Sequence, residues 1–281
     1  MKKKKIIVLS VSLVIIALLL AGIFLIPPLE NDESINEAMR DEVLHEVNKI
    51  SLFGLEVNPG LISAFTVTGV LFVFSLIVRI FVIPRFSYVP KKFQLILETA
   101  VGTFDDMAKG SSPARNKFLG AYIFTAAAYI FVGTLFELFG LQAVTTLNRS
   151  VALPAPLADI NGAITMGCVS YLVIFGGGII SNGIKGAGKT LKDFSLPISM
   201  SFRLFGALLS GALVTELVYY FSALSFVLPV VVGVMFTLLH ALIQAYVLTM
   251  LTSLFYGEVS EKSLKKNKKV IKNKKEVVKN V

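Results

Sequence analysis

Long runs of apolar residues separated by shorter polar segments dominate this sequence. A membrane-spanning helix needs about 20 predominantly apolar residues, and six runs are long enough to cross a bilayer or lie deep in it. These six predicted membrane helices cover residues 6–26, 61–83, 118–138, 163–184, 194–223 and 226–256. Residues 30–50 mix apolar and acidic positions and predict a short, exposed amphipathic helix. The pattern therefore predicts an all-α integral membrane protein with about six membrane helices. We find no internal repeat among the six segments, which disfavours a secondary transporter.

The composition supports the same class of protein. Hydrophobic residues make up 55% of the 281 residues and charged residues only 16%, and the mean hydropathy is +0.76. A soluble domain of this length would carry about a quarter charged residues. The single cysteine, Cys168, lies in an apolar run, so no disulfide can form within the chain.

The charged residues are unevenly distributed, and their distribution predicts the orientation of the chain. Residues 27–60 hold eight acidic and two basic side chains, whereas residues 84–117 hold six basic and three acidic ones. Cytoplasmic loops carry the excess of lysine and arginine. Both termini are therefore expected in the cytoplasm, with 27–60 and 139–162 outside. The nine lysines after residue 257 fit a solvated cytoplasmic tail better than a nucleic-acid site.

Three parts of the chain are predicted on these grounds. Residues 1–60 combine an N-terminal membrane helix with an acidic external segment, 61–256 form the membrane domain, and 257–281 form the basic cytoplasmic tail. The lysine-rich start followed by an apolar run also describes a secretory signal peptide. The length of that run and the lack of a clear cleavage site before Pro27 favour an uncleaved anchor.

Residues 183–190, G-I-K-G-A-G-K-T, satisfy the phosphate-loop pattern G-x-x-x-x-G-K-[ST]. That loop works only between a strand and a helix of a soluble α/β core. Here the preceding residues end a predicted membrane helix, and nothing downstream resembles a parallel sheet. We therefore expect a flexible, lysine-bearing cytoplasmic turn and no nucleotide site.

Arg203 lies inside the apolar stretch 194–223. An arginine in a membrane segment costs from about 3 to well over 10 kcal/mol, and its pKa is too high for it to lose the charge. On a helix, Gly206, Ala207, Ser210 and Gly211 share its face, and such small residues allow another helix to approach closely. The sequence therefore predicts an anionic partner for Arg203, with a packing seam beside a snorkelling arginine as the alternative.

Two motifs near the C-terminus carry a resemblance to a known family. They are S-F-R-L-F-G-A-L-L-S-G at 201–211 and A-L-I-Q-A-Y-V-L-T-M-L-T-S-L at 241–254. Two weaker matches lie upstream, V-P-K-K-F-Q-L-I-L-E at 89–98 and L-P-A-P-L-A-D-I-N-G-A-I-T at 153–165. Together and in this order, these stretches resemble subunit a of F-type ATP synthases.

The resemblance implies a non-catalytic, ion-translocating subunit. In that family the last two membrane helices are long and tilted, and they pack against a rotating ring of c subunits. Two offset half-channels lead to the ring carboxylates; Arg203 matches the essential arginine between them and Gln244 its neighbouring glutamine. The resemblance further implies a b-subunit peripheral stalk and the rest of the synthase as partners, the bacterial cell membrane as the location, and no cofactor or metal. The carried ion, H⁺ or Na⁺, stays open, because the ion-binding carboxylate belongs to the c subunit.

Two polar residues of the last two predicted helices are candidates for the ion path. Glu216 is a carboxylate in a membrane segment, about 140° around the helix from Arg203, so it is expected to face a half-channel. His240 lies on one polar stripe with Thr237 and Gln244, and its imidazole can titrate near neutral pH.

Other candidates lie towards the outer side. Asp159 and Asn161 match the D-x-N motif of the family and are expected at the outer mouth, although Asp159 also suits an ordinary helix cap. Glu137 replaces an asparagine common in the family and is expected near the outer membrane surface.

The sequence also departs from the family pattern. Ala207, Ala212 and Thr237 stand where the family has polar residues, and the link 185–194 is short and lacks the amphipathic stretch usual before the arginine helix. Two rival functions stay open: a permease that binds an anionic substrate at Arg203, and a membrane scaffold in which Arg203 only pairs with an acid of a partner subunit.

Overall fold

The computed structural model describes residues 10–18, 21, 50–52, 55–113, 116–144, 150–220 and 228–260. Helices dominate these residues, which confirms the predicted all-α class. The helices are Pro59–Ile77 (α3), Lys92–Ser111 (α4), Asn116–Phe136 (α5), Ile160–Asn182 (α6), Ile184–Lys192 (α7), Ser195–Tyr220 (α8) and Leu228–Ser260 (α9). Two short antiparallel hairpins pair Ile50–Leu52 (β1) with Leu55–Val57 (β2) and Gln142–Val144 (β3) with Ser150–Ala152 (β4).

Five of the six predicted membrane helices are confirmed. The described helices that are long and apolar enough to cross a membrane are Pro59–Arg85, Asn116–Phe139, Ile160–Asn182, Ser195–Thr215 and Val230–Ser260. Of the first predicted helix, 6–26, the structure describes residues 10–18 and 21, which are helical. The helix expected at 30–50 lies outside the described residues, apart from Ile50 at the start of β1, and so does the tail from residue 261.

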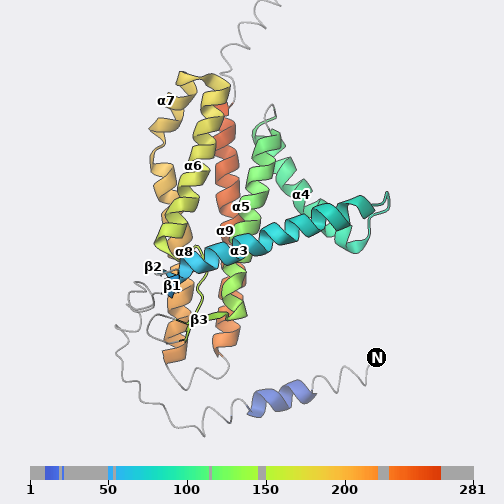
Figure 1. The fold of residues 1–281 in the computed structure, drawn as a ribbon, viewed down its shortest axis with the longest axis vertical. Helices are drawn as coiled ribbons and strands as arrows, with labels where there is room; N and C mark the ends of the chain where they lie inside the picture. Colours follow the sequence, from blue (N-terminus) through green and yellow to red (C-terminus); the bar gives the residue numbers. More distant parts are fainter. Residues whose placement is uncertain are drawn as a thin grey trace, which may run out of the picture.

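Four helices, α5, α6, α8 and α9, run side by side as an elongated bundle, and α3 crosses it (Figure 1). Within the bundle α5 packs along α9, and α6 packs along both α8 and α9. Leu119 and Ile130 of α5, Ile174 of α6 and Leu204 of α8 are fully buried in its core. Many large apolar residues on the outer faces are exposed. Such faces suit lipid or an apolar protein surface.

Glycines let α6 approach its neighbours closely. A Cβ atom added to Gly177 would overlap the ring of Tyr256 on α9, and one added to Gly167 would overlap Ser201 of α8. The Ser201 hydroxyl donates to the Pro197 carbonyl oxygen at 2.7 Å, so it is satisfied inside this contact. Small residues at helix crossings gain van der Waals contact in a membrane, where no hydrophobic effect drives association. These contacts position α6 against the α8–α9 hairpin.

Hydroxyl pairs tie α4 to the end of α9. The Ser112 and Ser260 Oγ atoms lie 3.0 Å apart, and the Ser253 hydroxyl donates to Ser111 Oγ at 2.8 Å. A Cβ atom on Gly257 would overlap the Ser111 carbonyl group. The C-terminal ends of these two helices are therefore held together by packing and by satisfied polar groups.

The flexible turn expected after α6 is wrong. Gly183, with φ of 61°, reverses the chain, and residues 184–192 form α7, which packs on α6 and α9. Lys189 Nζ lies 3.2 Å from Glu258 Oε1 and donates to the Glu258 carbonyl oxygen at 2.7 Å. Gly186 and Thr190 are buried while the lysines are exposed, so the link does contain an amphipathic helix. Since helix α6 precedes this segment instead of a strand, the phosphate-loop geometry is absent.

Candidate functional site

The hairpin formed by α8 and α9 contains the Arg203 and Gln244 motifs. The two helices run antiparallel and pack against each other (Figure 1). Their register is marked by Gly211, where an added Cβ atom would lie 3.2 Å from Nδ1 of His240. Because the helices are antiparallel, one turn from Gly211 towards the start of α8 brings Ala207 about level with Gln244. Arg203 lies four residues further towards the start of α8, about 6 Å beyond that level at about 1.5 Å rise per residue.

Arg203 lies on the outer face of α8. Its side chain is exposed, as is that of Phe202, whereas Leu204 is buried in the bundle. None of the acidic side chains that the structure describes forms an ion pair with it. An arginine keeps its charge, and an uncompensated charge in a membrane is costly. The described residues of the bundle therefore supply no charge that compensates Arg203.

The small residues near Arg203 divide between two surfaces. Gly206 and Ser210 are exposed, and a Cβ atom added to Gly206 would meet no atom within 4 Å. Ala207 and Gly211 are partly buried, and Gly211 is in contact with His240. The Ser210 hydroxyl donates to the Ala207 carbonyl oxygen at 2.8 Å, so it needs no other partner. The outer surface at Gly206 and Ser210 therefore carries only small residues beside Arg203 and the exposed Phe202, and small residues allow close approach by another helix.

Gln244 is a buried polar residue on α9. Its side chain is 5% exposed, and its Oε1 atom finds no hydrogen-bond donor among the described residues. Buried side-chain acceptors are nearly always paired in folded proteins. Gln244 thus holds an unused acceptor about one helical turn from the level of Arg203.

His240 and Thr237 continue the polar stripe of α9 beyond Gln244. Thr237 is buried and His240 is partly buried. The His240 ring lies against the backbone of Gly211 and has its centroid 5.9 Å from that of Phe236. Gly211 is thus the position that gives the imidazole its space between the two helices.

Asp159 forms the helix cap that the sequence left as one of two alternatives. Its Oδ1 atom accepts from the backbone N–H of Asn161 at 3.3 Å, at the start of α6. Its side chain also faces the start of α3, where a Cβ atom on Gly60 would lie 2.9 Å from the Asp159 Cβ atom. Asn161 is exposed. The Asp159 carboxylate therefore caps α6, where the partial positive charge of the helix N-terminus favours it, and packs beside the start of α3, whose own cap is Asn58.

The structure places Asp159 closer to the level of His240 than to that of Arg203. Gly167 packs on Ser201, and α6 and α8 run antiparallel. Asp159 lies two turns from Gly167, about 12 Å along the axis, towards the half of α8 that contains Gly211. The D-x-N motif and the arginine therefore lie at separate levels of the bundle.

The other two acidic candidates are placed only in part. Glu216 belongs to α8, more than one turn beyond Gly211, and its side chain lies outside the described residues. Glu137 is partly buried in the short 3-10 turn that follows α5, and its carbonyl oxygen accepts from the N–H of Gly140 at 3.1 Å. The structure thus leaves the roles of both as predictions.

Two polar contacts were not predicted from the sequence, although Gln94 and Glu98 of the second contact belong to the stretch 89–98 that resembles the family. The Tyr122 hydroxyl lies 2.8 Å from Ser170 Oγ between α5 and α6. Gln94 bonds the backbone N–H and carbonyl of Ser87 at 3.2 and 2.9 Å and donates to Glu98 Oε1 at 2.8 Å. The Q-x-x-x-E spacing, which puts both side chains on one helix face, could have indicated the second contact. Tyrosine and serine in apolar runs carry no comparable signal.

Comparison with known sequences decides the family. A sequence model of the family described as ATP synthase A chain matches residues 61–257. The chain belongs to this family. The matched region contains both the Arg203 motif and the Gln244 motif. The resemblance to the family that these motifs indicated is therefore confirmed.

Relatives within the family match much of the chain. The ATP synthase subunit a of Cereibacter sphaeroides is 26% identical over 183 residues, which cover 61% of this chain and 70% of the relative. The ATP synthase subunit a 2 of Vibrio campbellii is 24% identical over 221 residues, 69% of this chain and 85% of the relative. The sodium ion specific ATP synthase subunit a of Propionigenium modestum is 24% identical over 282 residues, 91% of this chain and 96% of the relative. Family membership and five membrane-length helices identify a multi-pass membrane component of an ATP synthase.

Proposed function

We propose that this chain is the ion-conducting stator subunit of a rotary ATP synthase. Two offset half-channels carry protons or Na⁺ to and from the carboxylates of a c-subunit ring, and Arg203 separates the half-channels. The observation that carries this proposal is the position of Arg203. It is an exposed cation on the outer face of a membrane helix, beside the open surface at Gly206, with no ion-pair partner among the described residues.

The physical chemistry of a passing carboxylate explains why such a cation is useful. In lipid a carboxyl group is neutral, because desolvation raises its pKa. Next to Arg203 the charged form is favoured, so the carboxyl group releases its ion there. The fixed positive charge also repels cations and blocks a direct leak between the half-channels. An ion must then travel around with the ring, gaining about 2.3 kcal/mol per charge for each 100 mV.

The polar residues behind and beside Arg203 supply candidates for the path. Gln244 offers its free Oε1 atom as an acceptor for the guanidinium. His240, one turn further, and Asp159, near the same level at the start of α6, belong to the half-channel from the outer side. Asn161 and Glu216 complete that route, with water carrying the proton where side chains do not meet.

The proposed assembly includes the c ring, a b-subunit peripheral stalk and the remaining synthase subunits in the bacterial cell membrane. Both termini lie in the cytoplasm if the first segment is uncleaved. This orientation places the exposed Lys185, Lys189 and Lys192 on the cytoplasmic side, as the excess of positive charge requires. ATP is formed elsewhere in the complex, so this chain has no catalytic residues of its own.

The substitution Arg203→Ala tests the proposal, with Arg79→Ala as the matched control at another exposed arginine. We expect ATP synthesis driven by an imposed ion gradient in membrane vesicles to fall at least about tenfold, or about 1.4 kcal/mol of coupling, in Arg203→Ala alone. Passive ion leak should rise in vesicles stripped of the catalytic part, while the c ring still co-purifies. Arg203→Lys keeps the charge but loses the planar fork of donors, so it should block leak better than Arg203→Ala.

Three results would contradict the proposal. Retained ATP synthesis in Arg203→Ala would remove the barrier role of the arginine. Loss of the ring from the purified complex would indicate a scaffold. Loss of uptake of a small anion with ATP synthesis intact would indicate a permease.

A further inference from the structure

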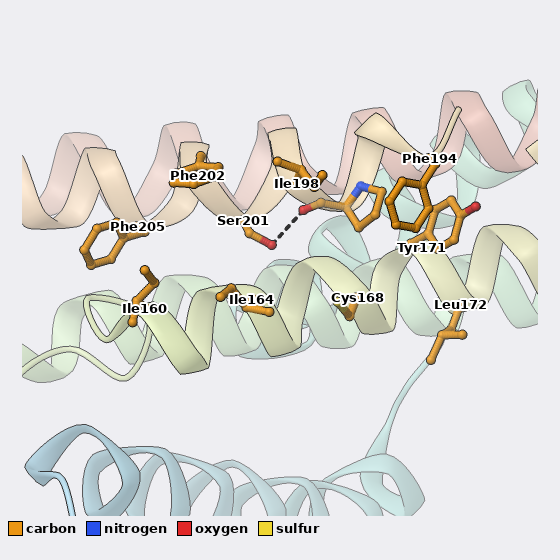
Figure 2. A pocket seen from close by; sticks show the side chains of 11 residues that line it. Ile160, Ile164, Cys168, Tyr171, Leu172, Phe194, Ile198, Ser201, Phe202 and Phe205 are labelled. Carbon is orange, nitrogen blue, oxygen red and sulfur yellow. Dashed lines mark hydrogen bonds between the residues drawn. The ribbon is translucent and has the colours of Figure 1, made fainter. Parts of the chain in front are cut away.

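An apolar groove runs along the outside of α6 and α8. It has a volume of about 370 Å³, and Figure 2 shows side chains of both helices around it. Ile164 and Leu172 come from α6, and Ile198 and Phe202 come from α8; all four are exposed large apolar residues. The groove lies on the α6 side of α8, whereas Leu204 and Leu208, on another face of that helix, are buried in the bundle. Arg203 and Gly206 are not among the residues that line the groove, but Phe202, which does line it, is exposed next to Arg203, so the groove borders the surface at Arg203.

The groove is lined by hydrocarbon apart from two hydroxyl groups and the thiol of Cys168, which behaves as a small apolar group with a weak donor. Two hydroxyl groups line it, and both are already used: Ser201 donates to the Pro197 carbonyl oxygen at 2.7 Å, and Tyr171 donates to the Thr190 carbonyl oxygen at 3.2 Å. A bound water needs two to four polar partners, and a polar ligand needs groups that fix its orientation. An apolar chain is the occupant that this lining suits.

The length of the groove fits one lipid chain. Its α6 lining runs from Ile160 to Leu172, which is about 18 Å at a rise of about 1.5 Å per residue. One leaflet contributes half of a hydrocarbon core of about 30 Å. An acyl chain lying along the two helices therefore fills the groove from end to end.

One end of the groove lies at the C-terminal end of α7, a helix that carries three lysines. Phe194, which lines that end, comes directly after α7, and Lys185, Lys189 and Lys192 are exposed on α7. Lys189 Nζ is paired with Glu258 Oε1 at 3.2 Å. Asp193 directly precedes the groove-lining Phe194 in the sequence. Lys185 and Lys192 of α7 thus outnumber Asp193, whose charge acts on the groove-lining Tyr171, and this leaves a net positive charge on α7 and its C-terminal end that would favour an anionic headgroup.

We propose that this groove binds an anionic phospholipid, with one acyl chain between α6 and α8 and the headgroup beside Lys185 and Lys192. The proposal requires only that α6 and α8 lie in the membrane and is independent of the ion path at Arg203. Such a lipid covers an apolar surface that the rest of the described chain leaves open and links α7 to the bundle.

The absence of tryptophan from the sequence permits a direct test. The full-length chain carrying Leu172→Trp is reconstituted in phosphatidylcholine vesicles that contain brominated-chain phosphatidylglycerol or brominated-chain phosphatidylcholine, and quenching of tryptophan fluorescence is measured. Phe74→Trp is the matched control, because Phe74 is 49% exposed on α3, which also ends near arginines, but does not line the groove. We expect the relative binding constant to favour phosphatidylglycerol about fivefold at Leu172→Trp and to stay close to one at Phe74→Trp.

Lysine variants decide whether the headgroup is recognised. Adding Lys185→Gln and Lys192→Gln to Leu172→Trp should abolish the preference, whereas Lys91→Gln with Lys92→Gln on α4 should preserve it. Equal quenching by both lipids at Leu172→Trp would overturn the proposal, and so would an equal preference at Phe74→Trp. A preference that survives the α7 substitutions would also overturn it, as would the absence of quenching, which would mean that protein covers the groove.

Discussion

The substitution Gly206→Leu separates packing inside the chain from packing against a partner. A Cβ atom at Gly206 would meet no atom of the described chain within 4 Å, and the residue is exposed. The folded chain can therefore accept leucine at no steric cost, and exchange of glycine for leucine in a helix gains about 0.8 kcal/mol of helix propensity. Unfolding of the chain alone should then be unchanged or slightly less favourable.

The same leucine should be costly if a rotor helix packs on this surface. Overpacking of a tight contact costs about 1–3 kcal/mol, which corresponds to about a 5- to 150-fold loss in the equilibrium of a close approach. We expect ATP synthesis in membrane vesicles, or the yield of co-purified ring, to fall within that range. Gly69→Leu on α3 is the matched control, since Gly69 is also exposed with no atom within 4 Å of an added Cβ atom.

The assay compares the two variants at equal levels of the chain in the membrane. ATP synthesis within twofold of the unmodified protein in Gly206→Leu would refute a tight interface at Gly206. An equal loss in Gly69→Leu would show that any added bulk in a membrane helix disturbs the protein, and the reasoning from Gly206 would fail.

Two further predictions follow from contacts elsewhere in the chain. In Gly177→Ala the added Cβ atom would overlap the Tyr256 ring, so the stability of the detergent-solubilised protein should fall by about 1–3 kcal/mol. Gly176→Ala, whose added Cβ atom meets no atom within 4 Å, should leave the stability unchanged. Equal thermal denaturation of the two variants would contradict this prediction. The hydrogen bond and charge of Asp105, with Nζ and Oδ2 2.6 Å apart, raise the pKa of Lys109 above its usual 10.5. The stability that this pair contributes is present below the usual pKa and is lost as pH rises through the raised pKa. Asp105→Asn should therefore speed acylation of the Lys109 amine near pH 10 without affecting Lys92, and unchanged rates would refute the assignment.

The helices that cross the membrane could be predicted because their signal lies within single stretches of chain. Each needs about 20 apolar residues whatever its neighbours are, and five of the predicted spans correspond to helices long and apolar enough to cross. Arg203 could be selected on the same basis, because the cost of a charge in an apolar run depends little on the fold. The motif around it then indicated the family, which the match over residues 61–257 confirms.

The segment after α6 was predicted wrongly because its structure depends on distant residues. Its glycines and lysines indicate a flexible turn, but the ion pair of Lys189 with Glu258 and the bond from Asn182 Nδ2 to the Val259 carbonyl oxygen hold it against α9. Nine residues are too few for a stable isolated helix in water. Contacts with the C-terminal end of α9 therefore stabilise α7, which the helix propensity of its own residues would not do.

The membrane class, the apolar helices and the need of Arg203 for compensation could be read from the sequence, since these follow from the transfer cost of side chains. Which helix faces remain open depends on how the helices pack against one another. Packing turned Gly206 outward and Gly211 inward against His240, placed the α6 cap Asp159 beside Gly60 at the start of α3, and left an apolar groove between α6 and α8. Helix periodicity fixes which residues share a face, whereas the packing of several helices selects the face that is buried.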